Sequence, residues 1–229
     1  MCYVQNCNGE ENIMKNIQNL RIMKEKGTWG HVSNFILDLI LKYAGNSILD
    51  VGCAKGGYVE ALSKKGYKIY GIDLFLQYKN TQKFVLGTAT DLPFKDSSFD
   101  TILLLDVLEH VEDEEKVLNE IYRVCSKNII FSVPHEDKGE LEHYYLTYRP
   151  YWDISHVRYY SLKDIVSKLE NVGFKIIKIM YADPINPLGC FLHLCGVPHR
   201  FSIFIGKHIN KLPFVRKHFT KIVGVAEKK

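Results

Sequence analysis

The chain has 229 residues, of which 46% are hydrophobic and 24% charged, and its formal net charge is +4. That length suits one α/β domain with a full core and is short for two independent domains. The composition lacks repeats and low-complexity tracts, so it excludes a fibrous or disordered chain and predicts one soluble globular domain over residues 1–229.

Cysteine usage and the absence of targeting signals indicate the compartment. The six cysteines are scattered, and no basic region followed by an apolar stretch and a cleavage site is found at the N-terminus. No window approaches the roughly 20 uninterrupted apolar residues of a spanning helix. We therefore expect a cytoplasmic protein. The Cys190, His193, Cys195 and His199 spacing matches no common zinc pattern, so no metal site is predicted.

Helical and strand patterns alternate along the chain. Apolar residues at helical spacing predict two N-terminal helices, over 12–26 and 31–43. Later helices are predicted over 57–65, 112–125 and, after the N-cap Ser161, up to 171. Short β-branched runs predict strands over 47–51, 67–72, 83–86, 99–105, 128–133, 174–181 and 221–228. Strands that alternate with helices indicate a doubly wound α/β sheet.

A glycine-rich turn, "SILDVGCAKGG" over 47–57, follows the first predicted strand. In a doubly wound sheet the ligand binds at the carboxyl ends of the strands, where strand order reverses. Glycines permit a positive φ and close approach of the backbone to a ligand, and the following helix start offers free N–H groups. The spacing fits both a dinucleotide turn (Gly52, Ala54, Gly57) and the shorter S-adenosylmethionine turn (Gly52, Ala54, Gly56).

Acidic residues at the ends of the strands help to distinguish a dinucleotide site from an S-adenosylmethionine site. Asp50 suits a cationic amino-acid group better than a pyrophosphate, and Asp73 can accept both hydroxyls of a ribose. Asp91 can accept from an adenine amino group, with a neighbouring backbone N–H for a ring nitrogen. Asp106 ends the fourth strand, beside the place expected for the methionine half of S-adenosylmethionine.

These motifs carry a family resemblance. Residues 48–174 resemble the class I S-adenosylmethionine-dependent methyltransferases, type 11 group, through "ILDVGCAKG", "YGIDL", "ATDLPFKDSSFDTILLLDVLEHV" and "DISHVRYYSLKDIVSKLENVGF". The resemblance implies a seven-stranded sheet of order 3-2-1-4-5-7-6 with the last strand antiparallel. The family usually has glycine where this chain has Ala54.

The resemblance also implies a cofactor site for S-adenosylmethionine. The methionine side would be lined by Asp50, Gly52, Cys53, Ala54 and Gly56, the ribose by Asp73 and Leu74, the adenine by Asp91 and Leu92, and the cofactor's edge by Asp106, Val107 and His110. Cys53 is also expected to be a small buried filler.

Methyl transfer to a hydroxyl needs an aligned acceptor and a general base. His110 and His156 are the candidate catalytic residues, and His135 and His143 are further histidines that can face the cleft. The resemblance places the segment from Asp153 to Arg158 near the acceptor. The candidate substrate-binding residues are Trp29, Arg149, Trp152, His156 and Arg158.

A basic, apolar stretch lies before the last predicted strand. Between Asp183 and Glu227 there is no acidic residue, whereas Lys and Arg recur. We divide the chain into an N-terminal helical cap (1–45), a cofactor-binding core (46–181), a helical insertion or lid (182–220) and the last strand (221–229). The insertion, over 185–219, suits a lid that touches an anionic membrane or a lipid-linked acceptor. A buried cap or a dimer interface remains as an alternative.

The sequence therefore predicts an S-adenosylmethionine-dependent methyltransferase acting on oxygen of a small-molecule, sugar or lipid-linked acceptor. The alternatives are an NAD(P)-dependent oxidoreductase, which Asp50 disfavours, and a non-catalytic S-adenosylmethionine-binding protein. The fourth strand ends in "DVLEH", not in an Asn/Asp-Pro-Pro-aromatic amine-methylating motif, so a nucleic-acid base is not the expected acceptor.

Overall fold

The structure is a computed structural model that describes residues 32–75, 83–136, 153, 155–185, 192, 196–198, 201, 204–205, 208 and 218–229. Its elements follow one another as α2 (Asn34–Tyr43), β1 (Ser47–Val51), α3 (Gly57–Ser63), β2 (Lys68–Asp73), β3 (Phe84–Leu86), β4 (Phe99–Leu105), the 3-10 turn η2 (Leu108–His110), α4 (Glu114–Val124), β5 (Cys125–Pro134), α5 (Leu162–Val172), β6 (Phe174–Ile185) and β7 (His218–Lys228). The helix predicted over 12–26 lies outside the described residues.

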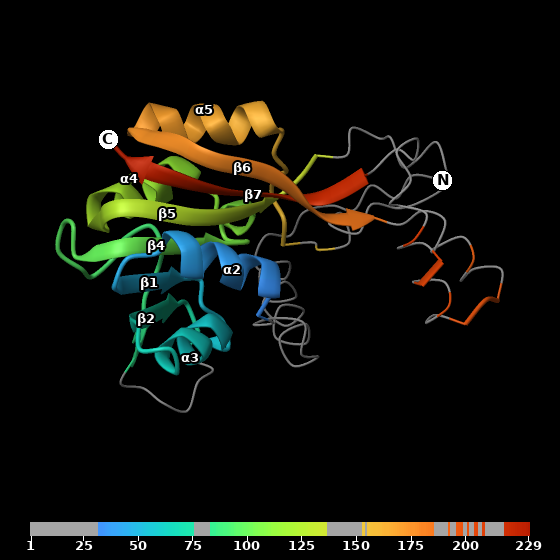
Figure 1. The fold of residues 1–229 in the computed structure, drawn as a ribbon. Coiled ribbons are helices and arrows are strands. Elements are labelled where there is room, and N and C mark those ends of the chain that lie inside the picture. Colours follow the sequence, from blue (N-terminus) through green and yellow to red (C-terminus); the bar gives the residue numbers. More distant parts are fainter. Residues whose placement is uncertain are drawn as a thin grey trace, which may run out of the picture.

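The strands form one mixed sheet (Figure 1). Its order is β3-β2-β1-β4-β5-β7-β6. The first five strands pair in parallel, and β7 runs antiparallel to both β5 and β6. This confirms the predicted fold. Strand order reverses beside β1, so the loops after β1 and β4 face each other at the carboxyl edge of the sheet, where ligands of such folds bind.

Two hydrophobic cores cover the two faces of the sheet. Because side chains alternate along a strand, Ile102 and Leu104 of β4 join the core beneath α4 and α5, while Leu103 joins the core beneath α2 and α3. The same alternation holds in β5, where Ile129 and Ile130 are fully buried on opposite faces. Continuous apolar strands are what a sheet covered on both faces requires.

The helices begin and end where their capping residues predict. The Asp113 side chain accepts the Lys116 N–H at the start of α4. Ser161 and Asp164 form a capping box at the start of α5, and Gly173 ends that helix with a φ of 113°. The inward faces of α4 and α5 bury Val117, Leu118, Ile121, Val124, Ile165 and Leu169.

The last two strands are longer than the sequence predicts. Antiparallel pairing continues to the pair Ile185 and His218, so β6 extends four residues beyond 181 and β7 begins three residues before 221. The connection between them is therefore 186–217, narrower than the predicted insertion over 182–220. Within the described residues, none of the helices has the length and apolarity that crossing a bilayer demands.

Candidate active site

The turn after β1 has the conformation that its glycines predict. Gly52, Ala54 and Gly56 have left-handed φ values of 72°, 47° and 71°. A Cβ on Gly52 would lie 2.6 Å from Cγ2 of Val107, in the loop after β4. Glycine at 52 is therefore required both by conformation and by the close approach of the two loops. Ala54 adopts the left-handed region at a cost of about 1–2 kcal/mol.

Two carboxylates flank this turn. Asp50 is 3% exposed, and burial, reinforced by Asp73, raises its pKa to about 8. Asp73 ends β2 and accepts the Ala54 N–H through Oδ2 at 2.8 Å and the Phe75 N–H through Oδ1 at 3.0 Å. The aspartate expected at the ribose is thus oriented by the turn that it faces, while Asp50 is held in a site that favours its neutral form.

The remaining residues expected at this end of the cofactor differ in exposure. Cys53 is buried, and its Sγ would lie 2.6 Å from a Cβ on Gly71, so it fills the space beside β2. Leu74, after β2, is 62% exposed at the rim. Exposed apolar surface at that position is available to a ligand, whereas Cys53 offers mainly its backbone.

The loop expected at the adenine is fastened to α4. The Leu92 N–H donates to the Glu120 carboxylate at 2.8 Å, and Arg123 Nη2 donates to the Leu92 carbonyl at 2.9 Å. The backbone N–H expected to reach an adenine nitrogen therefore already has an acceptor in this structure. Asp91 is exposed and borders a hollow of about 530 Å³ beside α4, lined by Thr90, Asp91, Asp113, Glu115, Lys116, Asn119 and Glu120.

The carboxylate of Asp106 is held by two strands. Asp106 has a φ of 54°, and its Oδ1 accepts the Ser132 hydroxyl of β5 at 2.7 Å. Its Oδ2 is paired with Lys221 of β7. The Asp106 side chain is 40% exposed. Its partial burial would by itself raise its pKa, but Lys221 and Ser132 hold the pKa below its usual value. Both oxygens of this carboxylate are therefore engaged within the protein.

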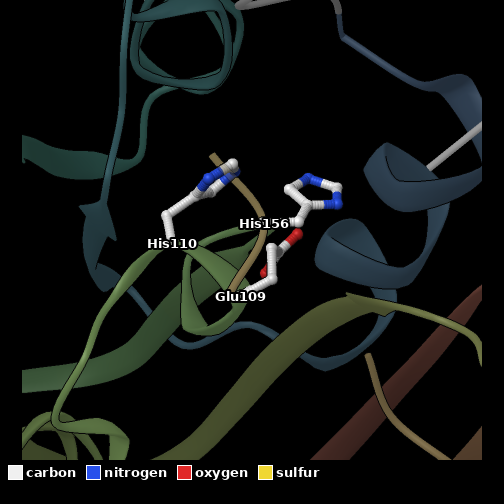
Figure 2. A group of neighbouring side chains, drawn as sticks. All are labelled: Glu109, His110 and His156. Atoms are coloured by element: carbon white, nitrogen blue, oxygen red, sulfur yellow. The ribbon is translucent and has the colours of Figure 1, made fainter. Parts of the chain in front are cut away.

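Three side chains gather beyond Asp106 (Figure 2). Glu109 and His110 lie on η2, and His156 lies on the segment before α5. One oxygen or nitrogen from each lies within 4.8 Å of the others. The two imidazole rings are 4.7 Å apart and tilted by 65°. The structure thus brings together the two histidines predicted as catalytic candidates and adds a glutamate.

The cluster is buried. Glu109 is 1% exposed, and its Oε2 has no hydrogen-bond partner among the described residues; the same holds for His156 Nδ1. Burial, and then the charge of Asp106, raises the pKa of Glu109 well above its usual value. Burial, and then His110, lowers the pKa of His156. His156 is therefore a neutral imidazole at physiological pH.

A short loop orients both histidines. Ser155 Oγ lies 2.9 Å from His110 Nδ1, and Asp153 Oδ1 accepts the Ser155 N–H at 3.0 Å. Asp153 Oδ2 lies 3.6 Å from His156 Nε2. The Val157 N–H donates to the Glu109 carbonyl at 2.8 Å and fixes this loop on η2. Asp153 therefore braces the two rings from one side.

Arg158 makes main-chain contacts. Its guanidinium donates to the carbonyls of Leu108 at 3.3 Å and Glu112 at 2.8 Å, and it lies 3.6 Å from the Glu114 carboxylate. These contacts tie the segment before α5 to η2, and they occupy the group expected to bind substrate. Trp29, Arg149, Trp152 and His143 lie outside the described residues.

Two residues of this site were not singled out from the sequence. Glu109 is adjacent to His110 in "DVLEH", and the placement of that motif after a buried strand was the available signal. Lys221 reaches Asp106 from 115 positions further along the chain, so only the pairing of β7 with β5 brings it here. His135, which follows β5, lies edge-on to Tyr181 of β6, with ring centroids 4.9 Å apart.

Known proteins share this arrangement of strands and loops. Residues 49–133 match the family model described as a methyltransferase domain. The matched segment runs from β1 to β5 and includes the glycine turn, Asp73, Asp106 and the pair Glu109–His110.

Two curated relatives are longer than the chain. Norajmaline N-methyltransferase of Rauvolfia serpentina is 31% identical over 40% of this chain and 37% of its own length. Sterol 24-C-methyltransferase of Pneumocystis carinii is 26% identical over 66% of this chain and 46% of its own length. The chain thus spans less than half the length of either, and their acceptors differ from each other.

A solved structure shows the same fold over the full chain. The Burkholderia thailandensis 1,6-didemethyltoxoflavin-N1-methyltransferase, with bound 1,6-didemethyltoxoflavin and S-adenosylhomocysteine, has a TM-score of 0.63. The match covers 100% of this chain and 93% of the other, at 12% identity. At that identity the likeness shows the fold alone.

Proposed function

We propose that the protein is an S-adenosylmethionine-dependent methyltransferase that methylates an oxygen of a small-molecule, sugar or lipid-linked acceptor. The observation that carries this proposal is the meeting of two loops at one edge of the sheet. The glycine turn after β1 contacts Val107, and the residues after Val107 carry the buried cluster of Glu109, His110 and His156.

The residues around the glycine turn fit the cofactor. The left-handed turn leaves no room for a Cβ at Gly52, which fits a backbone that a ligand approaches closely. Asp50 is buried with a raised pKa, and a cationic ammonium beside it would favour the carboxylate form. Asp73 is held at the end of β2, where an aspartate can accept ribose hydroxyls.

The chain's own residues position and deprotonate the acceptor. When bound, the cofactor supplies a methyl group on a sulfonium, which makes the methyl carbon electrophilic. His156, neutral because it is buried, is able to accept the proton of a hydroxyl. His110, held by Ser155, faces His156 edge-on. A hydroxyl acceptor is the one that most needs such a base, which supports the choice of oxygen.

Cofactor binding is the first test. We expect S-adenosylhomocysteine to bind the wild-type protein with micromolar affinity in a calorimetric titration, and Asp73→Asn to weaken binding at least tenfold. Asp38→Asn, an exposed position on α2, is the matched control and should bind as the wild type does. No binding to well-folded wild-type protein would refute the proposal.

The acceptor atom is tested separately. The protein would be incubated with ¹³C-methyl-labelled S-adenosylmethionine and hydroxyl-bearing small molecules, sugars and lipid-linked acceptors. The ¹³C chemical shift of the transferred methyl group distinguishes O-methyl from N-methyl and C-methyl products. A product labelled only on nitrogen or carbon would overturn the oxygen assignment and leave the methyltransferase intact.

We also propose that residues 185–219 touch an anionic membrane or a lipid-linked acceptor. Phe201 and Phe204 are 63% and 61% exposed, which supports a surface that meets apolar material. Flotation with anionic liposomes at low salt is the test. We expect co-flotation that is lost in Phe201→Ser/Phe204→Ser, and failure of the wild type to float would remove the membrane from the proposal.

A further inference from the structure

The cluster of Glu109, His110 and His156 has the composition of a metal site. One carboxylate and two imidazoles offer ligand atoms that all lie within 4.8 Å of one another. Two atoms bound to one tetrahedral ion at about 2.1 Å lie about 3.4 Å apart. Ligand atoms that are at most 4.8 Å apart therefore need to close by no more than about 1.4 Å, which rotation of the three side chains can supply.

Two buried atoms in this cluster lack the partners that buried polar atoms normally have. Among the residues that the structure describes, neither Glu109 Oε2 nor His156 Nδ1 has a hydrogen-bond partner. Leaving such an atom unsatisfied costs about 1–3 kcal/mol, and more for a charged group. One cation between them would satisfy both atoms at once, because a carboxylate oxygen and an imidazole nitrogen are both electron-pair donors.

The charges around the cluster favour a cation. Two carboxylates, those of Asp106 and Asp153, act on Glu109, together with the ammonium of Lys221. Lys221 is itself paired with Asp106. The surroundings therefore carry an excess of negative charge in a buried setting, where an uncompensated carboxylate is unfavourable.

The histidines are oriented as metal ligands usually are. A ligating imidazole normally has its second nitrogen held by a carboxylate or another acceptor. Asp153 lies 3.6 Å from Nε2 of His156, on the opposite side of the ring from the unpartnered Nδ1. Ser155, bound to Asp153, holds Nδ1 of His110. One aspartate thus braces both rings.

We propose that Glu109, His110 and His156 bind a divalent first-row transition-metal ion. Imidazole and carboxylate ligands suit Mn²⁺, Fe²⁺, Co²⁺ and Zn²⁺, and three protein ligands leave positions open for a further group. Asp106 is not a ligand in this arrangement, because Ser132 and Lys221 occupy its oxygens.

A role for the ion in catalysis rests on the proposed function. The ion would bind the acceptor hydroxyl and lower its pKa, so that the O–H proton passes to water. The oxygen's electron pair then forms the new C–O bond as the C–S bond of the sulfonium breaks, and the electrons of that bond stay on sulfur, giving the thioether. With the ion bound, the two histidines are ligands and not bases.

Metal binding can be measured on the purified full chain without cofactor or acceptor. Titration with Mn²⁺, followed by the loss of the free-ion electron paramagnetic resonance signal, reports the affinity. Mn²⁺ prefers nitrogen and oxygen ligands to thiolates, so cysteines contribute little. We expect one ion per chain, with at least tenfold weaker binding in Glu109→Gln and in His156→Gln. His208→Gln, at an exposed position, is the control and should bind as the wild type does.

The outcomes separate the metal site from the methyltransferase proposal. S-Adenosylhomocysteine affinity, measured on the same variants, reports that they are folded. Absence of saturable Mn²⁺ and Co²⁺ binding to the wild type, or equal binding in all variants, would overturn the metal site. Either result leaves cofactor binding untouched. Metal binding without methyl transfer to any hydroxyl would instead overturn the catalytic role and the oxygen assignment.

Discussion

The turn after β1 and the turn after β4 face each other, yet they are built in opposite ways. Around the first, the polar groups are satisfied locally: Asp73 accepts two backbone N–H groups, and the Gly52 N–H donates to the Ile72 carbonyl at 2.8 Å. Around the second, buried Glu109 and His156 keep atoms without partners among the described residues. Hydrogen bonds therefore hold the turn after β1 in place, whereas the turn after β4 presents two buried atoms that the proposed metal ion would bind.

The two sides also treat charge differently. For Asp50, beneath the first turn, burial and then the charge of Asp73 raise the pKa to about 8. Asp106, beneath the second, is paired with Lys221, which keeps its pKa low. The buried Asp50 carboxyl can ionise to pair with a cationic ligand. The Asp106 carboxylate already has Lys221 as its counter-ion and is not available to one. The comparison supports the proposal that the cofactor's amino-acid end binds at the first side and the acceptor at the second.

Gly52→Val should have the largest effect, a loss of cofactor affinity at the turn after β1. The new side chain starts 2.6 Å from Val107 Cγ2 and forces a β-branched residue to a φ of 72°, so the turn must move. We expect S-adenosylhomocysteine affinity to fall by at least about a hundredfold, roughly 2.7 kcal/mol. Calorimetry measures it. Gly66→Ala, where a Cβ meets no atom within 4 Å, is the control at a position that also has a positive φ.

Asp50→Asn should weaken cofactor binding and stabilise the folded protein. The wild-type protein must take up a proton at Asp50 on folding, because the folded pKa is about 8 and the ordinary value is 3.8. This proton uptake lowers the free energy of unfolding of the wild type. The loss is absent below pH 3.8, grows as the pH rises and levels off above pH 8. We expect the variant to be more stable at pH 8, by on the order of 2 kcal/mol, and to bind S-adenosylhomocysteine more weakly. Melting temperatures of the wild type and of Asp50→Asn from pH 4 to pH 9 test this. A difference in melting temperature that does not widen as the pH rises would contradict the prediction.

The fold and the first side were predictable because their signals are local. The strand pattern of 99–105 and 128–133 and the cap at Ser161 gave elements within a few residues of those observed. Asp50, the glycine turn and Asp73 belong to one β-turn-α-β unit, so their meeting follows from the order of the chain. The ends of β6 and β7 were misplaced because their pairing, and not their composition, sets where they stop.

The second side could be predicted only in part. His110 and His156 were candidates as individual residues, but nothing in the sequence states that a buried Glu109 would lie beside both, with its Oε2 unpartnered among the described residues. The Arg158 guanidinium pairs with backbone carbonyls whose positions depend on how η2 docks. Lys221 reaches Asp106 through an antiparallel strand from the far end of the chain. Contacts between distant segments need the sheet order before they can be inferred.

Asp153→Asn should weaken metal binding after β4 without removing a proposed metal ligand. The amide keeps the size of the carboxylate but loses the charge that faces His156 at 3.6 Å. Outer partners of ligating histidines typically contribute about 10–100-fold to metal affinity, and we expect Mn²⁺ binding at the lower end of that range, about tenfold weaker. Asp38→Asn should leave it unchanged. Unaltered Mn²⁺ affinity in Asp153→Asn would show that the loop does not brace the rings as ligands.

Lys221→Met should have the smallest effect. The pair is partly exposed, with side-chain exposures of 34% for Lys221 and 40% for Asp106, so solvent screens it and we expect a loss of about 1 kcal/mol, or about 2–4 °C in melting temperature. The pKa of Asp106 is lowered when folded, so this stabilisation is present above the ordinary carboxyl pKa and disappears as the pH falls through the lowered one. The difference between wild type and Lys221→Met should therefore shrink in acid, and the same change in an Asp106→Asn background should cost much less. If the loss persists at low pH and in that background, packing of the lysine stem, and not the ion pair, holds β7 to the loop after β4.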